Sequence, residues 1–191
     1  MGPGPVFRIR PATVKEYVLH VLFVCTGNIC RSPMAERLAA AYGNRLQIPN
    51  LTVSSAGTRA VVAHPIHQEA VPLIESLGAD ASDFSARQLK PQLMAGADLI
   101  ITMTKAHRDA ALEIAPQKLH RTFTLSEASE LVTGCGATKV AELFRLRPRL
   151  AHHELADIPD PIGQDSAFFA AVAAQIADLI PPIIDICRIP S

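Results

Sequence analysis

One short segment of the chain concentrates residue types that can do chemistry on an oxyanion. Residues 25–32 read Cys-Thr-Gly-Asn-Ile-Cys-Arg-Ser, so a cysteine stands six positions before an arginine, and a serine follows. A thiolate is a good nucleophile, and a guanidinium can bind two oxygens of a phosphate at once. Five intervening residues suffice to wrap backbone N–H groups around a tetrahedral anion. We therefore predict a phosphate-binding loop of the Cys-x5-Arg type, with Cys25 as nucleophile and Arg31 as anion ligand.

The backbone of this loop has to bend sharply. Gly27 is expected to allow a conformation with positive φ, and Asn28 tolerates one. With Thr26, Ile29 and Cys30 they form the part of the loop whose N–H groups would face the anion.

The sequence on either side predicts what holds the loop. Residues 18–25 are a nearly unbroken apolar run, typical of a strand buried on both faces, and residues 32–42 have a helical pattern. Ser32 suits the N-cap of that helix, and Gly43 suits its end. A helix N-terminus beside the loop favours both a bound anion and the thiolate form of Cys25.

Strand-like and helical patterns alternate along the rest of the chain. This alternation predicts an α/β fold: a single domain with a four-stranded parallel sheet flanked by helices on both faces. Ligands of such sheets bind beyond the carboxyl ends of the strands, where residues 25–31 fall. The further strand candidates are residues 51–54, 98–103 and 119–125, the last at a sheet edge, and the further helix candidates are residues 68–77, 105–114 and 166–180.

Two segments are harder to interpret. Pro181 and Pro182 should kink or end the last helix. Residues 132–157 fit the alternation less well, although residues 140–153 have a basic helical pattern that Pro148 interrupts.

Composition excludes several classes of protein. The 191 residues include 18 lysines and arginines against 18 aspartates and glutamates, so the basic excess of a general nucleic-acid binder is missing. Residues 1–17 contain no apolar run of signal-peptide length, and no window of the sequence approaches the length of a membrane span. We therefore expect a cytoplasmic protein with no nucleic-acid or membrane partner. Residues 1–17 are expected to be an N-terminal arm that need not all be native, and residues 18–191 the folded domain.

The histidines and remaining cysteines do not form a pattern typical of a metal site. His64 and His67, like the pair at residues 152–153, have no cysteine or carboxylate set to complete a coordination sphere, so we expect exposed loop histidines. Cys135 and Cys187 are interpreted as structural or incidental. We predict no metal and no cofactor.

The loop and its flanking residues also resemble those of a known family. The segment VLFVCTGNICRSPMAE resembles the signature of low-molecular-weight protein-tyrosine phosphatases. The resemblance extends, in family order, to four further segments and so spans most of the chain from residue 18 to the last helix. These segments are Ser54-Ser55-Ala56-Gly57-Thr58, Ala86-Arg87-Gln88-Leu89, Asp98-Leu99-Ile100 and Asp160-Pro161.

The resemblance implies a two-step mechanism without a metal. Cys25 would attack phosphorus to form a phosphocysteine, while Arg31 and the loop stabilise the charge. Asp160 would protonate the leaving oxygen and then activate water. On spacing alone, Asp160-Pro161 would be a turn; Asp157 and Asp165 lie nearby but do not precede proline.

Further roles come from the same resemblance. Ser32 would hydrogen-bond the Cys25 thiolate, and Asn28 with Ser55 would hold the loop in shape. Cys30 is either a small buried residue or a second thiol that traps an oxidised Cys25 as a reversible disulfide. The implied partner is a protein containing phosphotyrosine, with inorganic phosphate or other oxyanions as competing ligands.

The chain departs from the family pattern where substrate binds. The family usually places aromatic residues after its Asp-Pro pair, and this chain has Ile162 and Gly163. A second aromatic position falls in residues 59–63, which contain none, and Phe84 replaces a frequent histidine. Because the chain has no tryptophan, two tyrosines and seven phenylalanines, ring stacking has few candidates.

Two other activities and one non-catalytic role are alternatives for this loop. Protein-arginine phosphatases resemble this family but place threonine where this chain has Ile29, which favours tyrosine-type activity here. Thiol-linked arsenate reductases add two cysteines close in sequence, whereas Cys135 stands far from Cys187. A non-catalytic phosphate-binding module would be expected to lack Cys25, Arg31 or Asp160.

Overall fold

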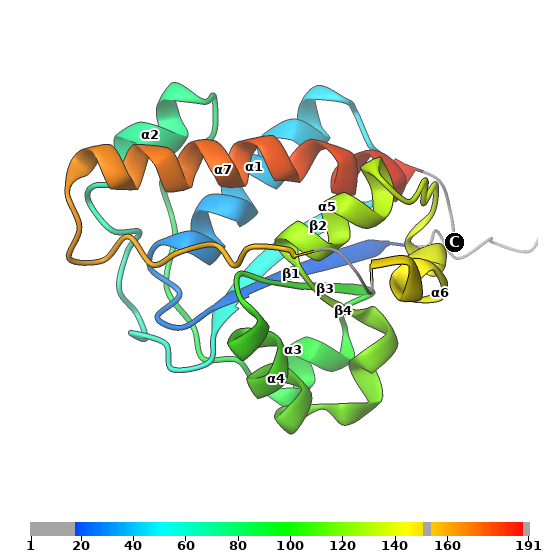
Figure 1. The fold of residues 1–191 in the computed structure, drawn as a ribbon. Coiled ribbons are helices and arrows are strands. Elements are labelled where there is room, and N and C mark those ends of the chain that lie inside the picture. The colour runs from blue at the N-terminus through cyan, green and yellow to red at the C-terminus, as the bar shows by residue number, and fades with distance from the viewer. Residues whose placement is uncertain (1–17, 151–153, 189–191) are drawn as a thin grey trace, which may run out of the picture.

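The computed structural model describes residues 18–150 and 154–188 (Figure 1), so the predicted N-terminal arm and the histidines at residues 152–153 lie outside the described residues. Its centre is a four-stranded parallel sheet with strand order β2-β1-β3-β4. The predicted sheet is confirmed, and β4 is at the edge as expected. The strands are β1 (Leu19–Cys25), β2 (Leu51–Gly57), β3 (Leu99–Thr102) and β4 (Thr122–Thr124).

Helices cover both faces of the sheet (Figure 1). Helices α1, α2, α5, α6 and α7 share one hydrophobic cluster with one face, and α3 and α4 share a second cluster with the other. Short 3-10 turns span Pro116–Arg121, Val140–Glu142, Arg147–Leu150 and Ile186–Arg188. The helices are α1 (Arg31–Arg45), α2 (Val71–Ser76), α3 (Pro91–Ala95), α4 (Lys105–Ile114), α5 (Leu125–Thr133), α6 (Leu143–Leu146) and α7 (Ser166–Asp185).

The unbroken apolar sequence of β1 follows from this layering. Successive strand side chains point to opposite faces, so Phe23 joins the α1, α5 and α7 side while Leu22 and Val24 join the α3 and α4 side. All three are fully buried. Cys25 ends the strand on the α1 side, which places its side chain beside the start of that helix.

Two helices do not end where a helix stop was expected, for different reasons. Gly43 does not end α1 but lies buried inside it, where a Cβ would come within 2.7 Å of Leu51 Cδ2; it permits close packing of α1 on β2. Helix α7 continues through Pro181 and Pro182 to Asp185. Residues on both sides of the prolines are buried in the core, and this burial outweighs the backbone hydrogen bonds that proline removes.

Helix α5 was not predicted, although its sequence carries a start signal. Thr124 Oγ1 accepts from Glu127 N, and Glu127 Oε2 accepts from Thr124 N, at 3.1 Å each. This reciprocal pair is a capping box, and it starts a helix directly from the end of β4.

The predicted helix at residues 140–153 is described up to Leu150, and there it is instead the short helix α6 between two 3-10 turns, which cover the edge strand β4. Arg147 lies over the ring of Phe123 at 4.2 Å, and its Nη2 donates to Thr122 O at 2.6 Å. Its Nε donates to Glu127 Oε1, also at 2.6 Å. Covering an edge strand in this way prevents pairing with another chain.

One helix of the described residues, Ser166–Arg188, is long and apolar enough to cross a membrane by length and composition. Phe169, Ile176 and Ile180 on this helix are buried, and α7 packs against α1 and α5. In this fold it is therefore a core helix.

Candidate active site

The residues singled out from the sequence gather at the carboxyl ends of the strands. Cys25 is the last residue of β1, and Arg31 is the first residue of α1. The loop between them therefore lies where a parallel sheet of this kind binds ligands, at the left of the view in Figure 1.

The loop turns its carbonyl groups away from the anion position. Residues 58–67 run along its outer side and donate backbone hydrogen bonds of 2.7 to 3.0 Å to the carbonyl oxygens of Cys25, Thr26, Gly27 and Ile29. Within residues 18–150 and 154–188, the N–H groups of Gly27, Ile29 and Cys30 have no protein acceptor. The loop thus presents donors on one side only, as an oxyanion requires.

Gly57 makes this close pairing of segments possible. A Cβ at Gly57 would collide with the carbonyl oxygen of Thr26. The glycine of the Ser-Ser-Ala-Gly-Thr segment is therefore explained by the close approach of the end of β2 to the anion loop.

Asn28 is the strained residue of the loop. Its φ is 55°, whereas Gly27 is not among the residues with positive φ, so the prediction for Gly27 is wrong. The fully buried Asn28 side chain uses both amide hydrogens, donating from Nδ2 to Ser32 Oγ at 2.9 Å and to Ser55 Oγ at 2.8 Å. Its Oδ1 accepts from Arg87 N at 2.8 Å. These three contacts compensate for the unfavourable backbone conformation.

Ser32 is not the N-cap of α1. The helix begins one residue earlier, with Cys30 in the cap position and no side-chain cap. Ser32 Oγ instead lies 3.0 Å from Cys25 Sγ. Because Ser32 Oγ already accepts from Asn28 Nδ2, its own proton is free to donate to the sulfur. Asn28 N donates to the same sulfur at 3.3 Å, so the thiolate form of Cys25 has two donors.

The network continues to a residue that the sequence did not indicate. Ser55 Oγ donates to Glu36 Oε2 at 2.5 Å, and Arg87 Nε donates to Ser55 O at 2.8 Å. Glu36 lies one turn after Ser32 on α1. No local pattern could have found it, because its role depends on β2 packing against that helix.

Asp160 faces the loop across Arg31. Arg31 Nη2 lies 2.6 Å from Asp160 Oδ2, and Nη1 donates to Ile158 O at 3.1 Å. Ile158 is fully buried and its N–H donates to Met103 O at 2.9 Å, so the segment that carries Asp160 is anchored at the end of β3. The Arg31 side chain is nearly buried, while that of Asp160 is half-exposed.

The two neighbouring aspartates have other contacts. Asp157 Oδ1 accepts from Lys105 N at 2.9 Å, at the start of α4. Asp165 is the N-cap of α7 and accepts from Phe168 N at 2.9 Å. Of these three aspartates, Asp160 is the one that contacts Arg31.

Cys30 is buried in the same loop as Cys25. Burial, with the negative charges of Cys25 and Asp160, raises the pKa of the Cys30 thiol to about 12 although Arg31 opposes the shift. At neutral pH it is a protonated thiol and a slow nucleophile. Burial likewise raises the pKa of Cys187 to about 12. The predicted trapping role of Cys30 stays a prediction.

The structure adds a histidine behind the loop. His107, buried in the first turn of α4, has Nε2 2.7 Å from Thr26 Oγ1. A lone histidine in a helical pattern carried no signal for this contact, because it depends on where α4 packs.

The mouth of the site is aliphatic. The side chains of Ile29 and Val61 both approach Gly27, and Ile162 donates its backbone N–H to Asp160 Oδ1 at 3.2 Å. Val61, Val62 and Ile162 are 38%, 59% and 44% exposed. Phe169 is buried and stacks on His67, with ring centroids 5.1 Å apart, so its ring is not presented to solvent.

Among the described residues, no group of three or more histidine, cysteine or carboxylate side chains could hold a metal ion. His64 is exposed, as expected, whereas His67 lies against Phe169 and donates its backbone N–H to Ile29 O.

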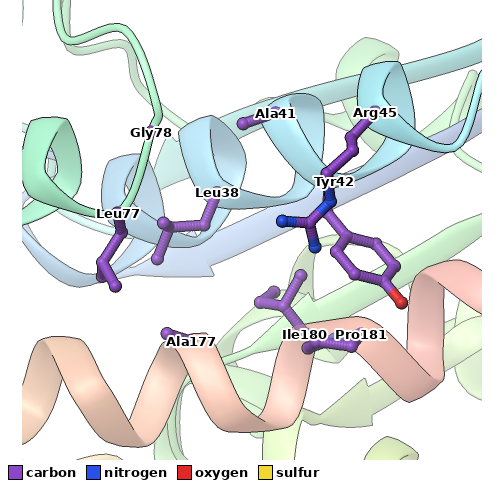
Figure 2. A pocket seen from close by; sticks show the side chains of 9 residues that line it. All are labelled: Leu38, Ala41, Tyr42, Arg45, Leu77, Gly78, Ala177, Ile180 and Pro181. Atoms are coloured by element: carbon purple, nitrogen blue, oxygen red, sulfur yellow. The ribbon is translucent and has the colours of Figure 1, made fainter.

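A separate pocket of about 370 Å³ lies between α1 and α7 (Figure 2). Its α1 residues come from the second half of the helix, away from the anion loop, and no cysteine, histidine or carboxylate side chain lines it. The lining residues are Leu38, Ala41, Tyr42, Arg45, Leu77, Gly78, Ala177, Ile180 and Pro181.

Comparison with known proteins agrees with the geometry. Residues 20–134 match the family model described as low molecular weight phosphotyrosine protein phosphatase. The chain is 31% identical over 150 residues to the low molecular weight protein-tyrosine-phosphatase Ptp of Acinetobacter johnsonii, covering 78% of this chain and 84% of that protein. It is 38% identical over 160 residues to a protein-arginine-phosphatase of Geobacillus stearothermophilus, covering 84% and 90%.

Solved structures of phosphatases are also similar to this chain. The low molecular weight protein tyrosine phosphatase from T. tengcongensis superposes with a TM-score of 0.70 at 29% identity, over 87% of this chain and 97% of that one. The YwlE arginine phosphatase from Geobacillus stearothermophilus superposes with a TM-score of 0.68 at 29% identity, over 87% and 90%. This chain belongs to the family of low molecular weight phosphotyrosine protein phosphatases.

Proposed function

We propose that this phosphatase hydrolyses phosphotyrosine in proteins, with Cys25 as nucleophile, Arg31 as anion ligand and Asp160 as acid and base. One observation supports these roles: the three groups lie together at the loop of residues 25–31, whose carbonyl oxygens face outward. The sulfur of Cys25 has two hydrogen-bond donors, and the carboxylate of Asp160 lies 2.6 Å from the buried guanidinium of Arg31.

In the first step the Cys25 thiolate attacks phosphorus. A sulfur–phosphorus bond forms, the ester phosphorus–oxygen bond breaks, and the leaving oxygen takes a proton from the carboxyl group of Asp160. The loop N–H groups and Arg31 bind the three remaining phosphoryl oxygens, whose charge they stabilise as it redistributes.

In the second step water attacks the phosphocysteine. Asp160, now a carboxylate, takes a proton from the water, and the sulfur leaves as a thiolate. That thiolate is stabilised by Ser32 Oγ and Asn28 N. Inorganic phosphate is the product, so phosphate and similar oxyanions are expected to compete with substrate.

The ion pair between Arg31 and Asp160 belongs to the site without bound substrate. A dianionic phosphoryl group competes with Asp160 for Arg31 Nη2. Substrate binding therefore frees the carboxyl group of Asp160 from Arg31, so that it can contact the leaving oxygen.

The choice of phosphotyrosine rests on the family and on Ile29. An aryl ring can pack on Ile29, Val61 and Ile162 by burial of apolar surface without aromatic stacking. Phosphoarginine is the second candidate, since similar proteins and structures are named arginine phosphatases and an aliphatic stem also fits this mouth.

The test is a comparison of peptides that differ only in the phosphorylated residue. Purified protein is given phosphotyrosine, phosphoarginine and phosphoserine peptides, with Cys25→Ser as the matched control. We expect preference for phosphotyrosine, loss of turnover by a factor on the order of 10³ or more in Cys25→Ser, and no effect of a metal chelator. Preference for phosphoarginine would overturn the substrate, and full activity of Cys25→Ser would overturn the mechanism.

Arsenate reduction is the remaining alternative for this loop. Cys135 follows the end of α5, which begins at the carboxyl end of β4 and runs away from the anion loop. Its thiol is therefore poorly placed to reduce a group bound to Cys25. We expect no thiol-coupled arsenate reduction, and Cys135→Ser should leave aryl phosphate turnover unchanged.

A further inference from the structure

A chain of three polar side chains reaches the anion loop from α4. Thr104 is the N-cap of that helix, and its Oγ1 accepts from His107 N at 3.1 Å. The same oxygen lies 2.9 Å from His107 Nδ1. The other ring nitrogen, Nε2, lies 2.7 Å from Thr26 Oγ1. Thr26 directly follows the nucleophile, so the chain connects a helix N-terminus with the first residue of the loop.

One tautomer of His107 gives both threonine hydroxyls a role. Burial, aided by the positive charge of Arg31, lowers the pKa of His107 to about 4, so the ring is neutral at physiological pH and carries one proton. With that proton on Nε2, the Thr104 hydroxyl, whose oxygen accepts from His107 N, donates to Nδ1. In this tautomer Nε2 donates to Thr26 Oγ1.

This direction leaves the hydroxyl proton of Thr26 unused. Within the described residues, Thr26 Oγ1 has His107 as its hydrogen-bond partner and no protein acceptor for its own proton. The half-buried Thr26 adjoins the nucleophile, and its own backbone carbonyl is occupied by Arg59 N. The hydroxyl is therefore a donor fixed in place beside an anion site.

We propose that the Thr26 hydroxyl donates a hydrogen bond to an oxygen of the bound phosphoryl group, and that His107 is the positioning residue that orients it. This inference rests on the proposed function, because it adds a side-chain donor to the backbone donors and Arg31. Thr104 completes the arrangement by fixing the tautomer of His107. Acting through Thr26, His107 takes no proton from substrate.

The central test removes the hydroxyl without changing its shape. Thr26→Val is expected to weaken inhibition by inorganic phosphate and to lower kcat/KM for a simple aryl phosphate about tenfold, the size of one hydrogen bond to a charged group. Thr26→Ser, which keeps the hydroxyl, is the matched control and should recover most of the loss. Equal phosphate affinity in Thr26→Val and wild type would overturn the proposal.

Two substitutions at His107 separate orientation from packing. The amide of glutamine can place a donor near the position of Nε2, whereas that of asparagine reaches only the position of Nδ1. His107→Asn should therefore resemble Thr26→Val in phosphate affinity, and His107→Gln should recover affinity. In the double variant His107→Asn with Thr26→Val, affinity should fall no further than in Thr26→Val alone.

Phosphate affinity is measured by calorimetry on protein whose melting temperature shows that it is folded, so this readout does not depend on turnover. Additive losses, or equal losses for asparagine and glutamine, would indicate a purely structural role and overturn the proposal. If wild type binds phosphate but hydrolyses no ester, the proposed function fails while the donor role is still decided by Thr26→Val.

Discussion

The floor and the mouth of the site are built on opposite principles. The floor is the anion loop with the buried side chains of Asn28, Ser32 and Ser55, in which every amide hydrogen of Asn28 has a partner. The mouth is formed by the exposed aliphatic side chains of Val61 and Ile162. A buried network with all partners present tolerates little change, whereas an exposed apolar surface tolerates much. Chemistry is thus fixed by the floor, and substrate choice is open to variation at the mouth.

After Cys25→Ser, the largest effect is expected where floor and mouth meet, at Asp160. Asp160→Asn removes the acid and the partner of Arg31 while keeping the shape of the side chain. For a peptide ester with a poor leaving group, we expect kcat to fall about 10²- to 10³-fold, since general acid catalysis contributes this much. For an activated aryl ester the loss should be several times smaller.

The same variant should bind phosphate more tightly than wild type, because Arg31 Nη2 no longer has a carboxylate 2.6 Å away. Steady-state rates on the two esters and calorimetry with phosphate provide the measurements. Equal rate losses on both esters would remove Asp160 from the acid role.

The next largest effect is expected within the floor, at Asn28. Asn28→Ala removes three hydrogen bonds and keeps an unfavourable φ, so we expect kcat/KM to fall about 10- to 100-fold and the free energy of unfolding to fall by about 2–4 kcal/mol. Asn28→Gly loses the same bonds but adopts positive φ freely. It should therefore unfold at a higher denaturant concentration than Asn28→Ala. Equal stability of the two would show that φ of 55° costs nothing.

Features that depend on neighbours in sequence could be predicted, whereas those that depend on distant contacts could not. The strand before Cys25 and the identity of the loop followed from local residue types, because strand burial and anion binding depend on neighbours in sequence. The strained position was assigned to Gly27 as well as Asn28, since the side-chain contacts that stabilise positive φ at asparagine come from Ser55 and Arg87, far along the chain.

The contacts that the sequence did not predict also depend on residues far along the chain. Glu36 and His107 reach the loop only through the packing of α1 against β2 and the placement of α4. The local pattern at Gly43 predicts a helix end, because the close contact with Leu51 is a tertiary one that neighbours in sequence do not indicate. By contrast, the capping box at Thr124 and Glu127 was readable, and it could have predicted α5.

A smaller effect is expected at the mouth. Ile162→Phe adds a ring beside the bound phosphotyrosine, and an aromatic pair adds about 0.5–1.5 kcal/mol beyond burial. We expect kcat/KM for a phosphotyrosine peptide to rise about 2- to 10-fold, with phosphate affinity unchanged because the floor is untouched. A change in phosphate affinity of similar size would show that mouth and floor are not independent.

The smallest effect concerns pH and lies behind the floor, at His107. The pKa of this buried ring is about 4 in the folded protein against 6.5 for the ordinary side chain, with Arg31 opposing its protonation and Asp157 and Asp160 favouring it. Between these values the unfolded chain binds more protons than the folded one, so stability from this group is present above pH 6.5 and is lost as the pH falls toward 4. His107→Gln should therefore weaken the rise in stability between pH 5 and pH 7.

The matched control for that change is a second histidine, His64, which is exposed. Urea unfolding at the two pH values measures both variants. Burial penalises a charged imidazole behind the floor, so the change in pH slope should be larger in His107→Gln than in His64→Gln. If His64→Gln changed the pH slope as much as His107→Gln, burial behind the floor would not be the cause of the effect at His107.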